Sequence, residues 1–219
     1  MHFTCFLWRG RDFWQPVARY GVEHVDVLAS MLHRHGGHTL TCVHDGIDLP
    51  PSIDGIRMPD AVAALPNYLP KLWAWSPELH EHFTTRMTFI DLDVVILGDL
   101  APIVDTDDDV LLWDSAAGEP YNTSLFTVTP GHGHAVWTHM TPMAVEYAKS
   151  RATRWTGDQS WVAHMLGPDC PTFGEDTGVI RYRPKLHYDS PPSGTRAAFL
   201  CGPRCPKTET SEWIRQSWR

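Results

Sequence analysis

The sequence predicts one α/β domain whose central sheet is mostly parallel in the first half of the chain. Its length of 219 residues suits a single domain of this class. A composition that is 42% hydrophobic and 20% charged is typical of a globular protein with a buried core. Strand-like and helix-like stretches alternate along the first half. In such sheets ligands bind at the carboxyl ends of the strands, where we therefore expect functional residues.

Two strands and a helix are predicted in the first 45 residues. The segments "HFTCFLW" at 2–8 and "TLTCVHD" at 39–45 are short apolar runs, as in buried strands. Between them a helix is expected across about 17–35, because apolar residues from Val25 to Leu32 recur at helical spacing.

A short third strand and two helices are expected next, at 55–59, near 68–75 and from about 77 to 84. The stretch "RMTFIDLDVVILGDL" at 86–100 then has the composition of a buried strand with Asp91 and Asp93 in its middle. Four further strands are expected at 110–114, 123–129, 178–183 and 197–202. Helices are expected at about 132–149 and 158–166.

Composition narrows the class of protein. No apolar run reaches the roughly 18–20 residues that a membrane-spanning helix needs, so we expect no membrane span. The five cysteines are odd in number and irregularly spaced, which argues against a disulfide framework and favours a reducing compartment. We therefore expect a cytoplasmic protein, in the host cytoplasm if the source is viral.

The charge of the chain is unevenly distributed. A formal net charge of −8 disfavours a nucleic-acid binder when taken alone. Basic residues nevertheless outnumber acidic ones from residue 179 to 219, whereas the preceding chain is acidic. This asymmetry suggests that an anionic ligand is bound from the C-terminal side, although an ordinary solvated surface explains it equally well.

Asp91 and Asp93 need a partner, because an unpaired buried carboxylate is costly. Residues i and i+2 of a strand point to the same side, so the two carboxylates can face one object together. Two close carboxylates favour either protonation of one or capture of a divalent cation, and hard oxygen ligands select Mg²⁺ or Mn²⁺. The alternative is that both cap a strand end by accepting hydrogen bonds from loop amides.

Five segments together resemble one enzyme family. "PKLWAWSPELHEHFTTRMTFIDLDVVILGDLAPI" resembles the stretch around the Asp-x-Asp motif of GT-A-fold glycosyltransferases, most like the glycogenin and bacterial lipooligosaccharide galactosyltransferase group. In the family's order the others are "VEHVDVLASMLHRH" with "TLTCVHDG", "YNTSLFTVTP", "GDQSWV" and "FLCGPRCPK". The resemblance reaches from about residue 2 to 207. It implies one GT-A domain over 1–219: a Rossmann-like, mostly parallel sheet flanked by helices, with a short basic C-terminal extension.

Within that domain the resemblance implies three parts. About 1–100 would form the nucleotide-sugar half ending in Asp-x-Asp, about 101–207 the sugar and acceptor half, and 208–219 a tail. Asp91 and Asp93 would hold Mn²⁺ or Mg²⁺ on the diphosphate of a nucleotide-sugar donor, with UDP as the favoured nucleotide. The donor-binding residues implied are Lys71, Asn122, Ser124, Gly202, Arg204 and Lys207.

The resemblance assigns the catalytic positions to Asp158 and Gln159, which would touch the sugar. Asp158 follows a glycine and opens a predicted helix, so a structural helix cap is the alternative. For Lys71 the alternative is an exposed helix lysine, and for Asn122 and Ser124 a polar strand edge.

One departure from the family concerns the third metal ligand. The family usually has a histidine just before the glycine of its last motif, where this chain has Phe199 or Cys201, depending on the register. His187 is the nearest upstream histidine and the candidate substitute. Otherwise two carboxylates, phosphate and water hold the ion alone.

The reaction implied is transfer of a glycosyl group to an acceptor hydroxyl. The tail "KTETSEWIRQSWR" mixes Arg with Trp213 and Trp218, which suggests 5-hydroxymethylpyrimidine in DNA as an acceptor. A protein or saccharide hydroxyl is the alternative. Two rival classes stay open: a nucleotidyltransferase, which also uses paired aspartates, and a binding module without catalysis.

Overall fold

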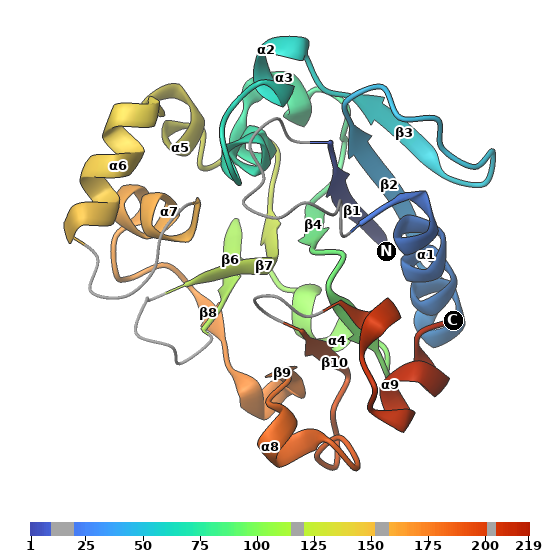
Figure 1. Cartoon of the computed structure of the whole chain (residues 1–219). Coiled ribbons are helices and arrows are strands. Elements are labelled where there is room, and N and C mark those ends of the chain that lie inside the picture. The colour runs from blue at the N-terminus through green and yellow to red at the C-terminus, as the bar shows by residue number, and fades with distance from the viewer. Residues whose placement is uncertain (10–19, 115–120, 152–157, 201–204) are drawn as a thin grey trace.

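The structure is a computed structural model that describes residues 1–9, 20–114, 121–151, 158–200 and 205–219. A seven-stranded sheet forms its centre, in the order β3-β2-β1-β4-β7-β6-β8 (Figure 1). Its strands are β1 (His2–Leu7), β2 (Thr39–His44), β3 (Asp54–Arg57), β4 (Met87–Ile90), β6 (Val110–Trp113), β7 (Asn122–Val128) and β8 (Thr172–Phe173).

The central sheet is mostly parallel, as the sequence predicts. Strands β1, β2, β3 and β4 all run in one direction, and β6 is parallel to β8. Strand β7 is antiparallel to its neighbours β4 and β6. The carboxyl ends of β1, β2 and β4 therefore lie at the same edge of the sheet as the amino end of β7.

A second sheet of three strands has the order β5-β10-β9, with bounds Val94–Ile96, Ala197–Phe199 and Val179–Arg181. Because β4 and β5 belong to different sheets, the prediction of one continuous strand over 86–100 is wrong. Asp91, Leu92 and Asp93 form the connection between the two sheets. Backbone pairing continues on both sides of it, since Asp91 N donates to Ser124 O (2.9 Å) and Leu200 N donates to Asp93 O (2.7 Å).

Two hydrophobic cores lie on opposite faces of the central sheet. Along β7, Leu125 belongs to one core and Phe126 to the other, because successive side chains of a strand point to opposite faces. The first core contains α1 (Val22–Gly36) and most of the small sheet. The second contains the 3₁₀ helix η1 (Leu69–Trp75) and α7 (Asp158–Leu166).

The shorter helices surround these cores (Figure 1). They are α2 (Asp60–Ala63), α3 (Pro77–His80), α4 (Ala101–Val104), α5 (Ala135–Thr138), α6 (Pro142–Arg151), α8 (Pro184–His187) and α9 (Glu212–Ser217), with 3₁₀ turns η2 (Glu175–Thr177) and η3 (Pro206–Thr208). The helix predicted over 132–149 is divided into α5 and α6 at Pro142, since proline has no N–H to continue a helix. Among the helices described, none is long and apolar enough to cross a membrane.

Candidate active site

The two aspartates of the Asp-Leu-Asp segment lie directly after β4, at the carboxyl edge of the parallel strands. Leu92 between them is buried, whereas both aspartates are partly exposed. The chain bends at Leu92 and Asp93, so this segment is not part of either sheet. Both carboxylates lie where ligands bind in parallel α/β sheets.

Lys71 of η1 joins Asp91 to a residue far away in the sequence. Its ammonium Nζ lies 2.7 Å from Asp91 Oδ1 and 3.5 Å from Asp158 Oδ2. The Lys71 side chain is only 13% exposed, so it is not the exposed helix lysine of the alternative reading. Burial disfavours its charged form, but the carboxylates of Asp91 and Asp158 outweigh burial and raise the pKa of Lys71. Lys71 is therefore charged and partly balances the negative charge of Asp91 and Asp158.

Asp158, the first residue of α7, is buried at the centre of this group. Its Oδ2 accepts a hydrogen bond of 2.5 Å from Thr123 Oγ1. The same oxygen faces Lys71, so it takes part in the site whether or not Asp158 also caps its helix. Gln159 follows on α7 and is half-buried.

The first three residues of β7 attach to the members of the site. Asn122 Oδ1 accepts a hydrogen bond from Ser124 N (2.8 Å), and Ser124 O accepts one from Asp91 N (2.9 Å). Thr123 O accepts a hydrogen bond of 3.4 Å from Lys71 Nζ. All three side chains are buried. The structure thus joins Ser124 to Asp91 through the backbone, and Asn122 to Ser124.

Asp93 has an unusual environment. Burial and the neighbouring Asp91 carboxylate raise its pKa to about 7. Among the residues that the structure describes, its buried Oδ1 atom has no hydrogen-bond partner. A buried carboxylate oxygen without a donor fits a divalent cation. Such an ion would offset the cost of burying the charge and the repulsion between the two carboxylates. In the part of the chain that the structure describes, however, no group of three or more His, Cys, Asp or Glu is placed to hold a metal ion.

Several predicted residues do not join this group. His187 lies in α8, after β9, and β10 separates β9 from β5. Its Nδ1 accepts a hydrogen bond of 3.1 Å from Arg183 N, so the structure does not bring His187 to the two aspartates. Phe199 is a buried residue of β10 without a ligating atom.

The basic residues of the last motif are only partly described. Lys207 Nζ lies 2.7 Å from Glu23 Oε1, at the start of α1, rather than beside Asp91 or Asp93. Gly202 and Arg204, like Cys201, lie outside the described residues.

The structure adds residues that the sequence interpretation missed. Trp8 and Asp45 are the first residues after β1 and β2. Trp8 Nε1 and Asp45 Oδ1 are buried and have no hydrogen-bond partner in the described part of the chain. The sequence could have indicated them, because each ends a predicted strand, at the strand end where ligands bind. Thr123 was missed as a contact of Asp158, because nothing in the sequence shows where a strand residue 35 positions earlier points.

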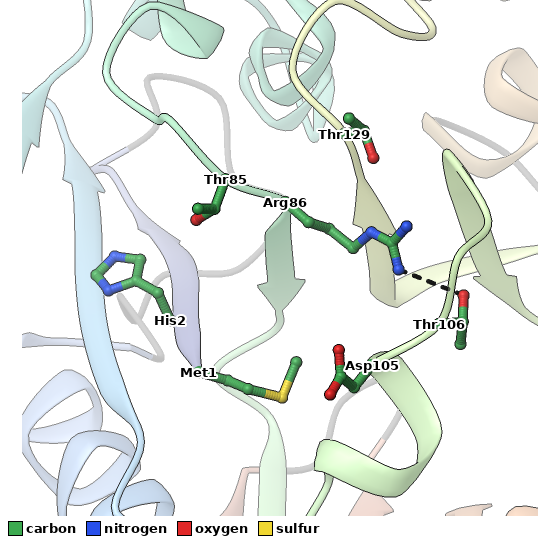
Figure 2. A pocket seen from close by; sticks show the side chains of 7 residues that line it. All are labelled: Met1, His2, Thr85, Arg86, Asp105, Thr106 and Thr129. Atoms are coloured by element: carbon green, nitrogen blue, oxygen red, sulfur yellow. Dashed lines mark hydrogen bonds between the residues drawn. The ribbon is translucent and has the colours of Figure 1, made fainter.

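A cavity of about 300 Å³ lies at the amino ends of the parallel strands, opposite the end of the sheet that carries the candidate active site. Figure 2 shows its lining, with Arg86 donating a hydrogen bond of 3.4 Å to Thr106. His2 and Arg86 stand at the amino ends of the parallel strands β1 and β4. This cavity contains none of the predicted site residues and is separate from the candidate active site.

Comparison with known proteins identifies the fold. No family model and no curated protein matches the sequence. Among solved structures, the galactosyltransferase LgtC in complex with donor and acceptor sugar analogues matches with a TM-score of 0.67 and 13% identity, over 99% of this chain and 93% of LgtC. The glycosyltransferase GlyE of Streptococcus pneumoniae TIGR4 matches with a TM-score of 0.64 and 10% identity, over 99% of this chain and 59% of GlyE. The chain has the GT-A fold of these enzymes, which confirms the predicted fold.

Proposed function

We propose that this protein is a metal-dependent glycosyltransferase that moves a sugar from a nucleoside diphosphate, UDP in the first instance, to an acceptor hydroxyl. The observation that carries the proposal is the arrangement of Asp91, Lys71 and Asp158 at the carboxyl edge of the sheet, in a fold shared with LgtC. Together with Asp93, these residues provide two carboxylates for a metal ion, a cation for phosphate oxygens and a buried carboxylate for a sugar.

In this proposal Asp91 and Asp93 hold Mn²⁺ or Mg²⁺. Support comes from the donor set, which consists of hard carboxylate oxygens, and from the buried Asp93 Oδ1, which has no hydrogen-bond partner among the described residues. The chemistry that a bound ion supplies is neutralisation of the charge that builds on the departing diphosphate. Phosphate and water complete the coordination, since His187 lies elsewhere.

We assign donor binding to the residues that the family resemblance indicates. They are Lys71, Asn122, Ser124, Gly202, Arg204 and Lys207. Trp8 and Asp45 join them on structural grounds. Their buried indole N–H and carboxylate oxygen have no partner among the described residues and suit the acceptor and donor groups of a nucleobase. Cations around a diphosphate stabilise a transition state in which negative charge grows.

Asp158 and Gln159 act on the sugar in this proposal. The Asp158 carboxylate is buried, so it has few water molecules to compete with a sugar hydroxyl. Carboxylate and amide groups together can accept and donate hydrogen bonds to a hydroxyl-rich ring. Gln159 lies next to Asp158 at the start of α7.

For the acceptor we propose a saccharide or protein hydroxyl, with 5-hydroxymethylpyrimidine in DNA as the second candidate. The DNA hypothesis needs exposed aromatic rings in the tail. Trp213 is buried, with its Nε1 donating to His187 O (2.8 Å), and Trp218 packs against the ring of His24. The buried Trp213 ring is not placed to stack on a base, and Trp218 is half-buried against His24.

We also propose the cytoplasm as the location of the protein. Among the described residues, Cys5, Cys42 and Cys170 are free thiols. Free thiols in this number are typical of a reducing compartment.

The test is incubation of the purified protein with UDP-glucose or UDP-galactose and Mn²⁺, with and without EDTA. We expect release of free UDP that EDTA abolishes, and a loss of at least about 100-fold in Asp91→Asn and Asp93→Asn, because each change removes a charged metal ligand. Asp107→Asn, in an exposed acidic turn, is the matched control and should keep full activity.

Two results of this assay would contradict the proposal. Release of pyrophosphate instead of UDP would indicate a nucleotidyltransferase. UDP release that neither EDTA nor the aspartate variants affect would exclude the metal role. Adding lactose, a hydroxyl-bearing peptide, plain DNA or hydroxymethylcytosine DNA in separate reactions identifies the acceptor, since the label then appears on one of them.

A further inference from the structure

We propose that Thr123 is a positioning residue, whose hydroxyl holds the Asp158 carboxylate in the orientation that the donor sugar requires. This inference rests on the proposed function of the site. It assigns a role to a residue that touches neither the expected metal position nor, in our proposal, the sugar itself.

The contact between Thr123 and Asp158 is short and buried. Thr123 Oγ1 lies 2.5 Å from Asp158 Oδ2, in the range typical of a hydroxyl that donates to a charged carboxylate. Thr123 is 3% exposed and Asp158 is 6% exposed, so water has little access to replace the hydroxyl. Removing the hydroxyl would therefore leave a buried carboxylate oxygen with a weaker set of donors.

The Lys71 ammonium also faces that oxygen as an ion-pair partner, but its charge is shared. Its Nζ lies 2.7 Å from Asp91 Oδ1 and only 3.5 Å from Asp158 Oδ2. A metal ion or diphosphate at Asp91 would compete for the charge of Lys71. Thr123 is not shared with Asp91, so its hydroxyl is the contact that keeps Asp158 in place when a donor binds.

The backbone of β7 directs the Thr123 hydroxyl. Pairing with β6 is irregular here, since Leu112 pairs with Phe126 whereas Trp113 pairs with Asn122. Such irregularities re-aim side chains and are common near functional sites. The main chain is held in place as well, because Thr123 O accepts a hydrogen bond from Lys71. A β-branched side chain also has few rotamers, which fixes its direction further.

The first test compares Thr123→Val with Thr123→Ser in the UDP-release assay with Mn²⁺. Valine keeps the shape and removes the hydroxyl, while serine keeps the hydroxyl and removes the methyl group. We expect kcat to fall about 10- to 100-fold in Thr123→Val with the donor KM within about threefold, and Thr123→Ser to stay within about threefold of the parent protein. Full activity in Thr123→Val, or an equal loss in both variants, would overturn the proposal.

The second test does not depend on activity. A double-mutant cycle of Thr123→Val and Asp158→Ala in urea unfolding measures how strongly the two side chains interact. We expect a coupling of about tenfold or more in the unfolding equilibrium constant, as for hydrogen bonds to a charged group. Additive effects would overturn the contact. A parent protein that hydrolyses no nucleotide-sugar, together with a clear coupling, would instead overturn the glycosyltransferase proposal and leave the contact standing.

Discussion

Lys71 Nζ lies 2.7 Å from Asp91 Oδ1, although Lys71 belongs to a 3₁₀ helix and Asp91 to the connection between two sheets. The same ammonium faces Asp158 Oδ2 at 3.5 Å. In a protein without bound metal, this side chain provides the positive charge that the acidic site needs. We infer that when a metal ion and a donor bind, the metal ion replaces the Lys71 ammonium as the partner of Asp91.

The first prediction concerns this cation and stability. Lys71→Met should lower the free energy of unfolding by about 2–4 kcal/mol, somewhat less than for a fully buried pair, because Asp91 is 29% exposed. The loss arises because Asp91 and Asp158 would remain without their counter-charge. Urea unfolding at pH 7 measures it, and Lys185→Met, an exposed lysine, is the control with almost no effect.

A combined variant checks the cause of that loss. Adding Asp158→Asn to Lys71→Met removes one of the two uncompensated charges, so part of the lost stability should return. If the double variant is less stable than Lys71→Met by the full effect of Asp158→Asn alone, the ion pair has no energetic role.

The second prediction concerns pH and His80. Gly131 N donates to His80 Nδ1 (3.1 Å), so the ring proton is on Nε2, which donates to Ala74 O (2.9 Å). Burial, aided by His134 and His132, lowers the pKa of His80 to about 4. Above pH 6.5 the ring is neutral in both the folded and the unfolded state, so the protein keeps the full stability that the neutral ring allows. Between pH 6.5 and 4 only the unfolded state gains a proton, so the free energy of unfolding decreases as the pH is lowered through this range.

Unfolding measured at pH 7 and at pH 4.5 tests this difference. The shift corresponds to a loss of about 2–3 kcal/mol over that interval. His80→Gln should lose less stability than the parent protein between the two pH values, whereas His139→Gln, at an exposed position, should behave as the parent does. An unchanged pH dependence in His80→Gln would contradict the assignment.

The third prediction concerns Lys207, which the family resemblance assigns to the diphosphate. Its ammonium lies 2.7 Å from Glu23 Oε1 on the surface. If Lys207 binds the donor it has to leave Glu23, so Glu23→Gln should lower the donor KM and Lys207→Ala should raise it, each about two- to fivefold. Both effects should weaken in 0.5 M salt because exposed charges are screened. Equal donor KM values in both variants would remove Lys207 from the donor site.

Much of the fold follows from local patterns in the sequence. Strands β1, β2 and β7 and helix α1 were predicted because each has a clear periodicity or a short apolar run. The division between β4 and β5 was not predicted, because an apolar run has the same composition whether its residues belong to one sheet or to two. Helices α8 and α9 were missed because four or six residues are too few to show a helical period.

The site was predictable only in part. The Asp-Leu-Asp segment was found from its paired carboxylates, and Lys71, Asn122, Ser124 and Asp158 by family resemblance. These residues lie in one connected group. His187 was chosen for its position in the sequence, which does not report that β10 lies between β9 and β5. Thr123, Trp8 and Asp45 depend on the direction and burial of single side chains, which only the folded chain shows.

The most direct test of the account is anomalous diffraction at the manganese edge from crystals soaked with Mn²⁺ and UDP. The account predicts a manganese peak about 2 Å from carboxylate oxygens of both Asp91 and Asp93, with the Lys71 ammonium turned away from Asp91 toward the diphosphate. A map without manganese at these two residues, with Lys71 still paired to Asp91 although UDP is bound, would contradict it.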